Sequence, residues 1–272
     1  MNKTIVLKKM SSEPGAPVRY YLDGFNMNFF LNRRISVKFE GFQCSNCKGY
    51  KPIFRQGYCQ SCFFDIPQAA DWIMRPELSK AHLDAEDRDL AYEKRVQLQP
   101  HIVYLVNSSN VKVGVTIKKQ VPTRYIDQGA DEAIEVLEVP NRYLAGVAQV
   151  AIKKHMSDKS NWRGMLQGNS SKNINMHNYY DLCKNIIESN PELNELLTPY
   201  FIKQNEALTK SLFFDYPINQ SRIRRVKILN MSNKKNFNGM LTGIKGQYLV
   251  FNNRDVLNVR ANEGQILNIK TI

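Results

Sequence analysis

Hydrophobic and polar positions change their period several times along the chain, and the clearest pattern covers residues 100–168. Three runs of β-formers predict strands: 101–106, 111–116 and AIEVLEV (133–139). Pro122 marks the start of a helix that ends at residues 127–129, and the apolar spacing of RYLAGVAQVAIKKHM (142–156) predicts a longer helix. These elements follow one another in the order β-β-α-β-α.

The flanking segments have other patterns. Residues 1–43 contain β-rich runs, whereas residues 175–213 carry apolar positions at helical spacing. Residues 217–272 return to a period of two, in short runs separated by Asn and Gly, which is typical of a small barrel or of a sheet packed on its neighbours. The acidic stretch at 75–93 is typical of a solvated helix or a linker.

Four cysteines follow the spacing C-x2-C-x11-C-x2-C: Cys44, Cys47, Cys59 and Cys62. Each C-x2-C pair places two thiolates on one tight turn, and two such turns complete a tetrahedral zinc shell in which no open position is left for catalysis. We therefore predict a structural zinc site, with two disulfides or metal-free thiols as the alternatives. The fifth cysteine, Cys183, lies on the apolar stripe of a helical pattern and is interpreted as a packing residue.

These patterns predict an α+β protein in four parts. The parts are a β-rich segment with the zinc knuckle (1–95), the β-β-α-β-α core (96–168), a helical connector (169–215) and a basic β segment resembling a small barrel (216–272). The first ten residues lack the apolar region of a secretory signal, and no run approaches 18 apolar residues. We therefore expect a cytoplasmic protein that neither spans a membrane nor forms disulfides.

Charge points to an anionic partner. Lys and Arg number 38 against 25 Asp and Glu, a net charge of +13, and nucleic acid, DNA or RNA, is the commonest large anion. The densest positive run is RIRRVK (222–227), with Arg222, Arg224 and Arg225 as candidate phosphate contacts. Tyr248 and Phe251 in the same segment are either base-stacking residues or core residues.

The hairpin IVYLVNSSNVKVGVT (102–116) is the second candidate site. Alternation puts three valines on one face of its second strand and Lys112, Gly114 and Thr116 on the other, and Tyr104 lies in the middle of the first strand. A glycine inside a strand often marks close approach of a ligand or a bulge. The pattern fits one wall of a binding groove as well as an ordinary half-exposed hairpin.

This hairpin resembles the GIY-YIG nuclease core. VYL (103–105) is similar to the first element of that superfamily, KVGVT (112–116) to a Lys form of its second element, and TRYIDQGA supplies the helical arginine as Arg124. The chain as a whole resembles an uncharacterised bacterial family, a domain of unknown function, that joins a cysteine-knuckle segment to such a core. The words carrying this second resemblance include RPEL (75–78) and GQYLVFNNRDVLNVR (246–260).

The resemblance implies roles for several residues. Tyr104 would orient or deprotonate a water, Arg124 and Lys112 would contact phosphate, and a glutamate on the later helix would hold magnesium. Gln149 stands where that glutamate is expected, and a neutral amide brings no charge to a metal.

The function expected from this pattern is therefore nucleic-acid binding by a zinc-stabilised protein with a degenerate core, with Thr116 beside the phosphate contacts. The alternatives are an active magnesium-dependent endonuclease and a protein-interaction scaffold that docks a partner on the C-terminal β segment. Glu132, Glu135 and Glu138 lie on the strand before the helix of Gln149, which is the wrong order for the glutamate of a nuclease.

Overall fold

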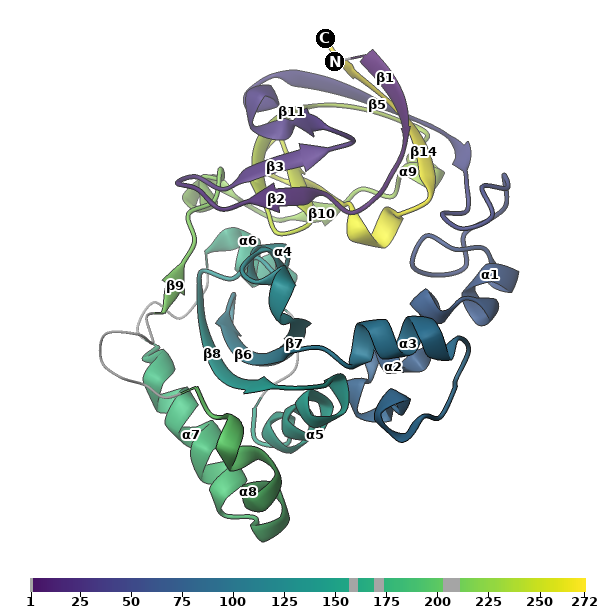
Figure 1. Cartoon of the computed structure of the whole chain (residues 1–272). Coiled ribbons are helices and arrows are strands. Elements are labelled where there is room, and N and C mark those ends of the chain that lie inside the picture. Colours follow the sequence, from purple (N-terminus) through teal and green to yellow (C-terminus); the bar gives the residue numbers. More distant parts are fainter. Residues whose placement is uncertain (1, 157–160, 169–173, 203–210) are drawn as a thin grey trace.

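The computed structural model describes residues 2–156, 161–168, 174–202 and 211–272. The protein is a mixed α+β structure with sheets of seven, three and four strands. Figure 1 shows the seven-stranded sheet at one end of the molecule, where both termini lie, and the four-stranded sheet at the other end with its helices. None of the helices within the described residues is long and apolar enough to cross a membrane.

The seven-stranded sheet combines the two ends of the chain. Its strands, in spatial order, are β1 (Asn2–Val6), β14 (Gln265–Thr271), β5 (Arg34–Phe42), β11 (Asn236–Lys245), β12 (Tyr248–Phe251), β13 (Asp255–Asn258) and β10 (Lys227–Ile228). β5 therefore lies between two C-terminal strands. Segments 1–95 and 216–272, separated along the chain, share one sheet and one hydrophobic core.

This arrangement corrects the expectation of a barrel-like C-terminal segment. Within the described chain, β1 and β10 pair only on their inner sides, so the sheet is open rather than a closed barrel. The run RIRRVK is mostly not a strand, because only Lys227 joins β10, while Arg222 ends a 3₁₀ turn and Ile223 is fully buried. A burial requirement at Ile223 overrides the alternating pattern there.

The remaining strands and helices complete the chain. β2 (Ser11–Glu13), β3 (Arg19–Leu22) and β4 (Phe25–Asn26) form the small sheet. The helices outside the central core are α1 (Gln60–Asp65), α2 (Asp71–Met74), α3 (Leu90–Gln97), α6 (Trp162–Gln167), α7 (Met176–Glu188), α8 (Pro191–Leu197) and α9 (Met231–Lys234). The acidic stretch 75–93 contains two 3₁₀ turns, Pro76–Leu78 and Ala81–Leu83, and the first residues of α3.

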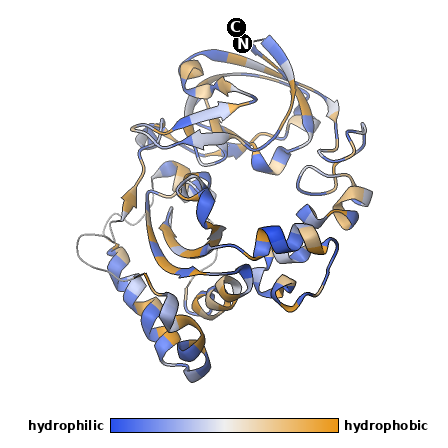
Figure 2. Cartoon of the chain, viewed as in Figure 1, coloured by the Kyte–Doolittle hydropathy of each residue, from blue (hydrophilic) through white to orange (hydrophobic). Residues whose placement is uncertain are grey.

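The central core has the predicted β-β-α-β-α order. Its elements are β6 (His101–Asn107), β7 (Val111–Ile117), α4 (Thr123–Asp127), β8 (Glu132–Val139) and α5 (Arg142–Lys153), and β9 (Leu212–Phe213) extends the sheet to β7-β6-β8-β9. Hydrophobic residues run through the strands of this sheet (Figure 2) because helices cover both faces.

The register of the hairpin confirms the predicted faces. Tyr104 pairs with Gly114, and Val106 pairs with Lys112, so these four residues lie on one face of the hairpin. The three valines of β7 pack instead into the core that α5 and α7 build on the opposite face. Cys183 of α7 is fully buried in that core, which confirms its packing role.

Close backbone approaches fix the surroundings of the core. Gly146 of α5 lies against the 3₁₀ turn Pro76–Leu78, where an added Cβ would be 2.2 Å from the Glu77 amide nitrogen. At the other side, Gly246 touches the chain after α4, since its Cβ would lie 3.0 Å from the Asp127 carbonyl oxygen. The fully buried Lys245 forms an ion pair with Asp131 beside this contact. The two large sheets are therefore held in one fixed arrangement.

Candidate functional site

The four cysteines form a cluster that can hold a metal ion. Cys44 and Cys47 occupy the turn after β5, while Cys59 caps α1 and Cys62 lies in its first turns. All four sulfur atoms lie within 4.8 Å of one another, and Cys47 Sγ is 3.9 Å from Cys59 Sγ. A tetrahedral zinc ion with Zn–S bonds of about 2.3 Å needs sulfur separations of about 3.8 Å. The donor set and its spacing fit zinc.

The surroundings of the Cys44 sulfur favour the thiolate. The Cys59 backbone N–H donates to Cys44 Sγ at 3.3 Å, and the Asn46 side-chain amide donates to Cys62 Sγ at 3.4 Å. Burial raises the pKa of the Cys44 thiol, but backbone N–H groups, that of Cys59 first, outweigh burial and lower this pKa to about 6. A thiolate is the form that a metal binds.

The cysteine loop is attached to the seven-stranded sheet. The Gln43 N–H donates to the Gly264 carbonyl oxygen at 2.8 Å, just before β14 begins. Gly57 has a φ of +79°, and a Cβ there would lie 3.2 Å from Glu263 Cβ. Glu263 in turn accepts a hydrogen bond from the Lys9 backbone N–H at 2.8 Å and forms an ion pair with Arg260. The cysteine loop is thus linked through Glu263 to Lys9 and Arg260.

Two adjoining pockets lie between the central core and the seven-stranded sheet. The pocket beside β7 has a volume of ≈ 250 Å³ and is lined by Lys112, Gln128 and Trp162 among others. The pocket beside α4 has a volume of ≈ 170 Å³ and is lined by Lys9, Arg124 and Arg260 among others. Both include Asp127 and Tyr248, so these two residues separate the pockets and the pockets lie next to each other. We call the two pockets together the groove.

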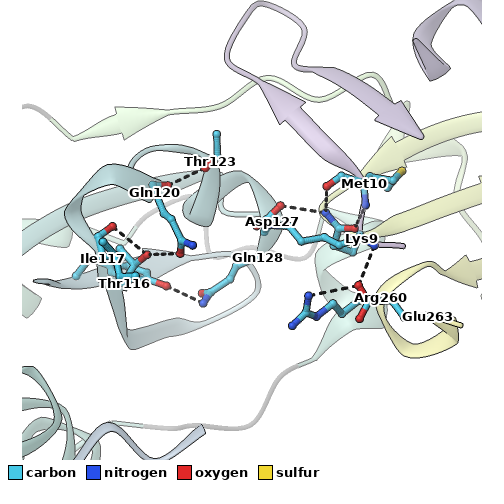
Figure 3. Close-up of polar contacts among 12 residues, drawn as sticks. Lys9, Met10, Thr116, Ile117, Gln120, Thr123, Asp127, Gln128, Arg260 and Glu263 are labelled. Carbon is cyan, nitrogen blue, oxygen red and sulfur yellow. Dashed lines mark hydrogen bonds and ion pairs between the residues drawn. The ribbon is translucent and has the colours of Figure 1, made fainter. Parts of the chain in front are cut away.

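The groove carries an excess of positive charge. Its lining includes four cations, Lys9, Lys112, Arg124 and Arg260, and one carboxylate, Asp127. Lys9 pairs with Asp127, and Arg260 lies 3.4 Å from Glu263, as Figure 3 shows for the region around α4. Burial lowers the pKa of Lys112, which is half-buried near the start of β7. The net charge of the lining is positive even with both ion pairs formed.

Aromatic rings lie at the junction of the two pockets. Trp162 at the start of α6 stacks on Tyr248 of β12, with ring centroids 5.8 Å apart and planes 9° apart. The guanidinium of Arg163 lies 4.5 Å from the Trp162 ring centroid. Trp162 and Lys9 are groove residues that sequence reasoning missed, and the adjacent Trp and Arg in NWRG were the available signal. Phe251 is 1 % exposed and belongs to the core instead.

Tyr104 lies beneath the groove and not at its surface. Its side chain is fully buried, and its hydroxyl accepts a hydrogen bond from Gln128 Nε2 at 2.8 Å. Burial raises the pKa of Tyr104, while the nearby Arg124 charge acts in the opposite direction. The Tyr104 ring lies against Gly114, and an added Cβ at position 114 would lie 2.5 Å from Tyr104 Cζ. This contact explains why a glycine occupies the position. Arg124 therefore connects the buried Tyr104 to the groove lining.

The other residues expected at a nuclease site lie apart from the groove. Gln149 is on α5, which packs on the sheet face opposite to Tyr104. Thr116 is buried and donates to Gln120 Oε1 at 3.2 Å. Of the acidic residues of β8, Glu135 accepts from the Tyr125 hydroxyl at 3.1 Å and Glu138 pairs with Lys118 at 2.7 Å. The structure brings Lys112, Arg124 and the Tyr104 hydroxyl together without Gln149 or Thr116.

The arginines of RIRRVK gather at a different place. Arg222, Arg224 and Arg225 join Arg254 around a pocket of ≈ 310 Å³ at the turn between β12 and β13. The groove meets the opposite end of β12, at Tyr248. The two basic regions therefore lie at the two ends of one strand.

The fold and its sites define a class of protein: a mixed α+β protein with a cluster of four cysteines close enough to hold a metal ion and a cationic groove between two sheets. The chain belongs to the family described as "Protein of unknown function (DUF2797)", whose family model matches residues 32–267. This match confirms the expected membership of an uncharacterised family. No curated protein and no solved structure matched the chain.

Proposed function

We propose that this protein binds nucleic acid in the groove and that a structural zinc ion in the four-cysteine cluster stabilises the part of the sheet that supplies Lys9 and Arg260. The observation that carries the proposal is the composition of the groove: four cations around a stacked Trp162–Tyr248 pair. Positive charge attracts the phosphate backbone, and an aromatic ring supplies a stacking surface that tolerates any base.

The charge distribution supports a polyanion rather than a small anion. The cations of the groove come from four separate segments of the chain: Lys9, Arg124 and Arg260 line the pocket beside α4, and Lys112 lines the adjoining pocket beside β7, so the positive charge extends over both pockets. An extended phosphate backbone that passes through both pockets can contact all four cations. The overall charge of +13 adds a long-range attraction for the same partner.

The groove is also preformed. Gln247, in the turn between β11 and β12, donates to Asp127 Oδ1 at 3.0 Å, and the neighbouring Gly246 packs closely on the backbone of Asp127 and Gly129. Little conformational entropy is then lost when a ligand orders the site. A ligand can therefore bind to the preformed charges of the groove without a rearrangement of the two sheets.

The proposal favours binding over cleavage within the GIY-YIG-like core. The Tyr104 hydroxyl is buried and occupied by Gln128, so it has no access to a water in the groove. Gln149 brings no negative charge for a magnesium ion and lies on the other side of the sheet. Arg124 and Lys112 are the two positions of the core that remain suited to phosphate, and both line the groove.

The test is a binding and cleavage assay on one set of probes. Fluorescently labelled single- and double-stranded DNA and RNA are titrated with the zinc-loaded protein, and the same probes are then incubated with magnesium and examined on a denaturing gel. We expect binding to at least one probe, weakened in Arg124→Ala and Lys112→Ala, and full-length probe after incubation.

A matched control separates the groove from general charge. Lys184 of α7 is a half-exposed cation on the far side of the core, and Lys184→Ala removes the same charge as the groove variants. Equal losses in Lys184→Ala and Arg124→Ala would contradict binding in the groove. Cleavage that disappears in Tyr104→Phe would replace binding by the endonuclease alternative.

A further inference from the structure

A second cleft, at the far end of β12, combines charge with apolar surface. The arginine pocket described above adjoins a pocket of ≈ 400 Å³, and both include Arg222 and Asn253. The second pocket is lined by the apolar side chains of Leu31, Ile218 and Met240 among others. We call the two together the arginine cleft. Each part reaches the volume that small-molecule sites in proteins have.

The arginines of this cleft have no anionic partner within the described parts of the chain. No ion pair joins Arg222, Arg224, Arg225 or Arg254 to a carboxylate there, and no carboxylate lines the arginine pocket. Four like charges around one concavity repel one another, and a bound anion removes that repulsion. The groove differs in this respect, because two of its cations are already paired.

The backbone holds the arginines in place. The Arg224 N–H donates to the Asn253 carbonyl oxygen at 3.1 Å, and the Lys227 N–H donates to that of Arg254 at 2.9 Å. Between these two bonds Arg225 has a φ of +46°, a left-handed conformation that costs energy for a side chain with a Cβ. An arginine kept in a strained position beside three others is typical of a site that uses the side chain.

We propose that the arginine cleft binds a nucleoside phosphomonoester, with the phosphate among the guanidinium groups and the nucleoside over the apolar pocket. A phosphomonoester carries a charge of about −1.5 to −2 and three acceptor oxygens, which suits several bidentate guanidinium contacts. A phosphodiester inside a strand carries one charge and two such oxygens, and satisfies the cleft less well. The apolar lining of Leu31, Ile218 and Met240 gives a ring a surface to pack on.

Two sources share this chemistry: a free mononucleotide and the phosphorylated end of a strand. The mononucleotide arm titrates the zinc-loaded protein with the four nucleoside 5′-monophosphates, with adenosine and with inorganic phosphate, by calorimetry. The strand arm compares one short oligonucleotide with and without a 5′-phosphate. Saturable binding of a monophosphate assigns the free ligand, and a preference confined to the phosphorylated oligonucleotide assigns the strand end.

The variants place the ligand. Loss of one charge-assisted contact weakens binding about tenfold or more, so Arg222→Gln and Arg224→Gln should each weaken phosphomonoester binding by that factor, and Lys184→Ala should not. All three positions are exposed or half-exposed, so the variants retain the core. Equal affinity for adenosine and its monophosphate, no discrimination in either arm, or binding that survives both Gln variants would overturn the proposal. The mononucleotide arm is independent of whether the groove binds nucleic acid.

Discussion

The substitution Gly114→Ala tests whether the central hairpin is built around a buried Tyr104. Gly114 is the cross-strand partner of Tyr104, and the ring lies over it. A Cβ at position 114 would lie 2.5 Å from Tyr104 Cζ and 2.6 Å from its hydroxyl oxygen. Carbon atoms in contact normally lie about 3.5–4.0 Å apart, so the new methyl group overlaps the ring by about 1 Å or more.

The ring has little freedom to move away. Tyr125 packs on it with centroids 4.6 Å apart, and Gln128 holds its hydroxyl. Overpacking of a tight core costs about 1–3 kcal/mol, and the full burial of Tyr104 places Gly114→Ala in the upper part of that range. We therefore expect the free energy of unfolding to fall by about 2–3 kcal/mol.

A double-mutant cycle supplies the assay. Urea unfolding is followed for the wild type, Gly114→Ala, Tyr104→Leu and the double variant. Leucine lacks the ring atoms that the new methyl group meets, so Gly114→Ala should cost about 0.5 kcal/mol or less in the Tyr104→Leu background, giving a coupling energy of about 2 kcal/mol. An equal cost of Gly114→Ala in both backgrounds would refute the placement of Tyr104 over Gly114.

Three further predictions concern other parts of the molecule. Removal of zinc with a chelator should raise amide hydrogen exchange in residues 43–66 and at Glu263, because the cysteine loop contacts Glu263. The amides of β6 to β8 should stay protected. An equal rise in exchange over the whole chain would contradict this local role of the zinc ion. Burial lowers the pKa of His101 to about 4, so the folded protein keeps this imidazole neutral while the unfolded chain gains its proton. Stability should therefore fall by up to about 3 kcal/mol as pH drops from about 6.5 to about 4, and His101→Asn should remove this part of the pH dependence of urea unfolding, whereas parallel pH profiles would disprove it. Both Arg225→Gly and Arg225→Ala remove the guanidinium, but glycine accepts the φ of +46°, so the glycine variant should be about 1 kcal/mol more stable; equal melting would argue against strain there.

The local sequence pattern was sufficient to predict the elements of the central core, because the hydrophobic period of each segment matches the strand or helix that it forms. The valines of β7 alternate with Lys112 and Gly114, and the structure places the two sets on opposite faces. Pro122 precedes α4 and Asn141 caps α5, where its side chain accepts from the Leu144 N–H at 2.9 Å. Local signals of this kind depend on neighbours in sequence and can be read directly.

The pairing of strands far apart along the chain could not be predicted from the sequence. β5 lies between β11 and β14, about 200 residues away along the chain, and no local pattern specifies such partners. A small barrel-like segment was expected for the same reason: the C-terminal strands were considered without β1 and β5. The groove could not be predicted for the same reason, since Lys9, Arg124 and Tyr248 come from three distant segments of the chain.

The site residues also divide into those that local sequence predicts and those that depend on distant parts of the chain. The cysteine cluster follows from spacing alone, because two C-x2-C turns bring their own ligands together. Arg124 and Lys112 were selected through resemblance and do line the groove, but the burial of Tyr104 depends on Tyr125 and Gln128 packing over it. Trp162 became a candidate only when Tyr248 of another segment was found stacked on it.

The salt dependence of nucleic-acid affinity tests the central claim most directly. If Lys9, Lys112, Arg124 and Arg260 each contact one phosphate, the logarithm of the association constant should fall against the logarithm of salt concentration with a slope of about −3.6 on duplex DNA or about −2.8 on a single strand. Arg124→Ala should flatten the slope by about 0.9 or about 0.7 respectively, and Lys184→Ala should leave it unchanged. An affinity that does not change with salt, or an Arg124→Ala slope equal to that of the wild type, would contradict binding of nucleic acid in the groove.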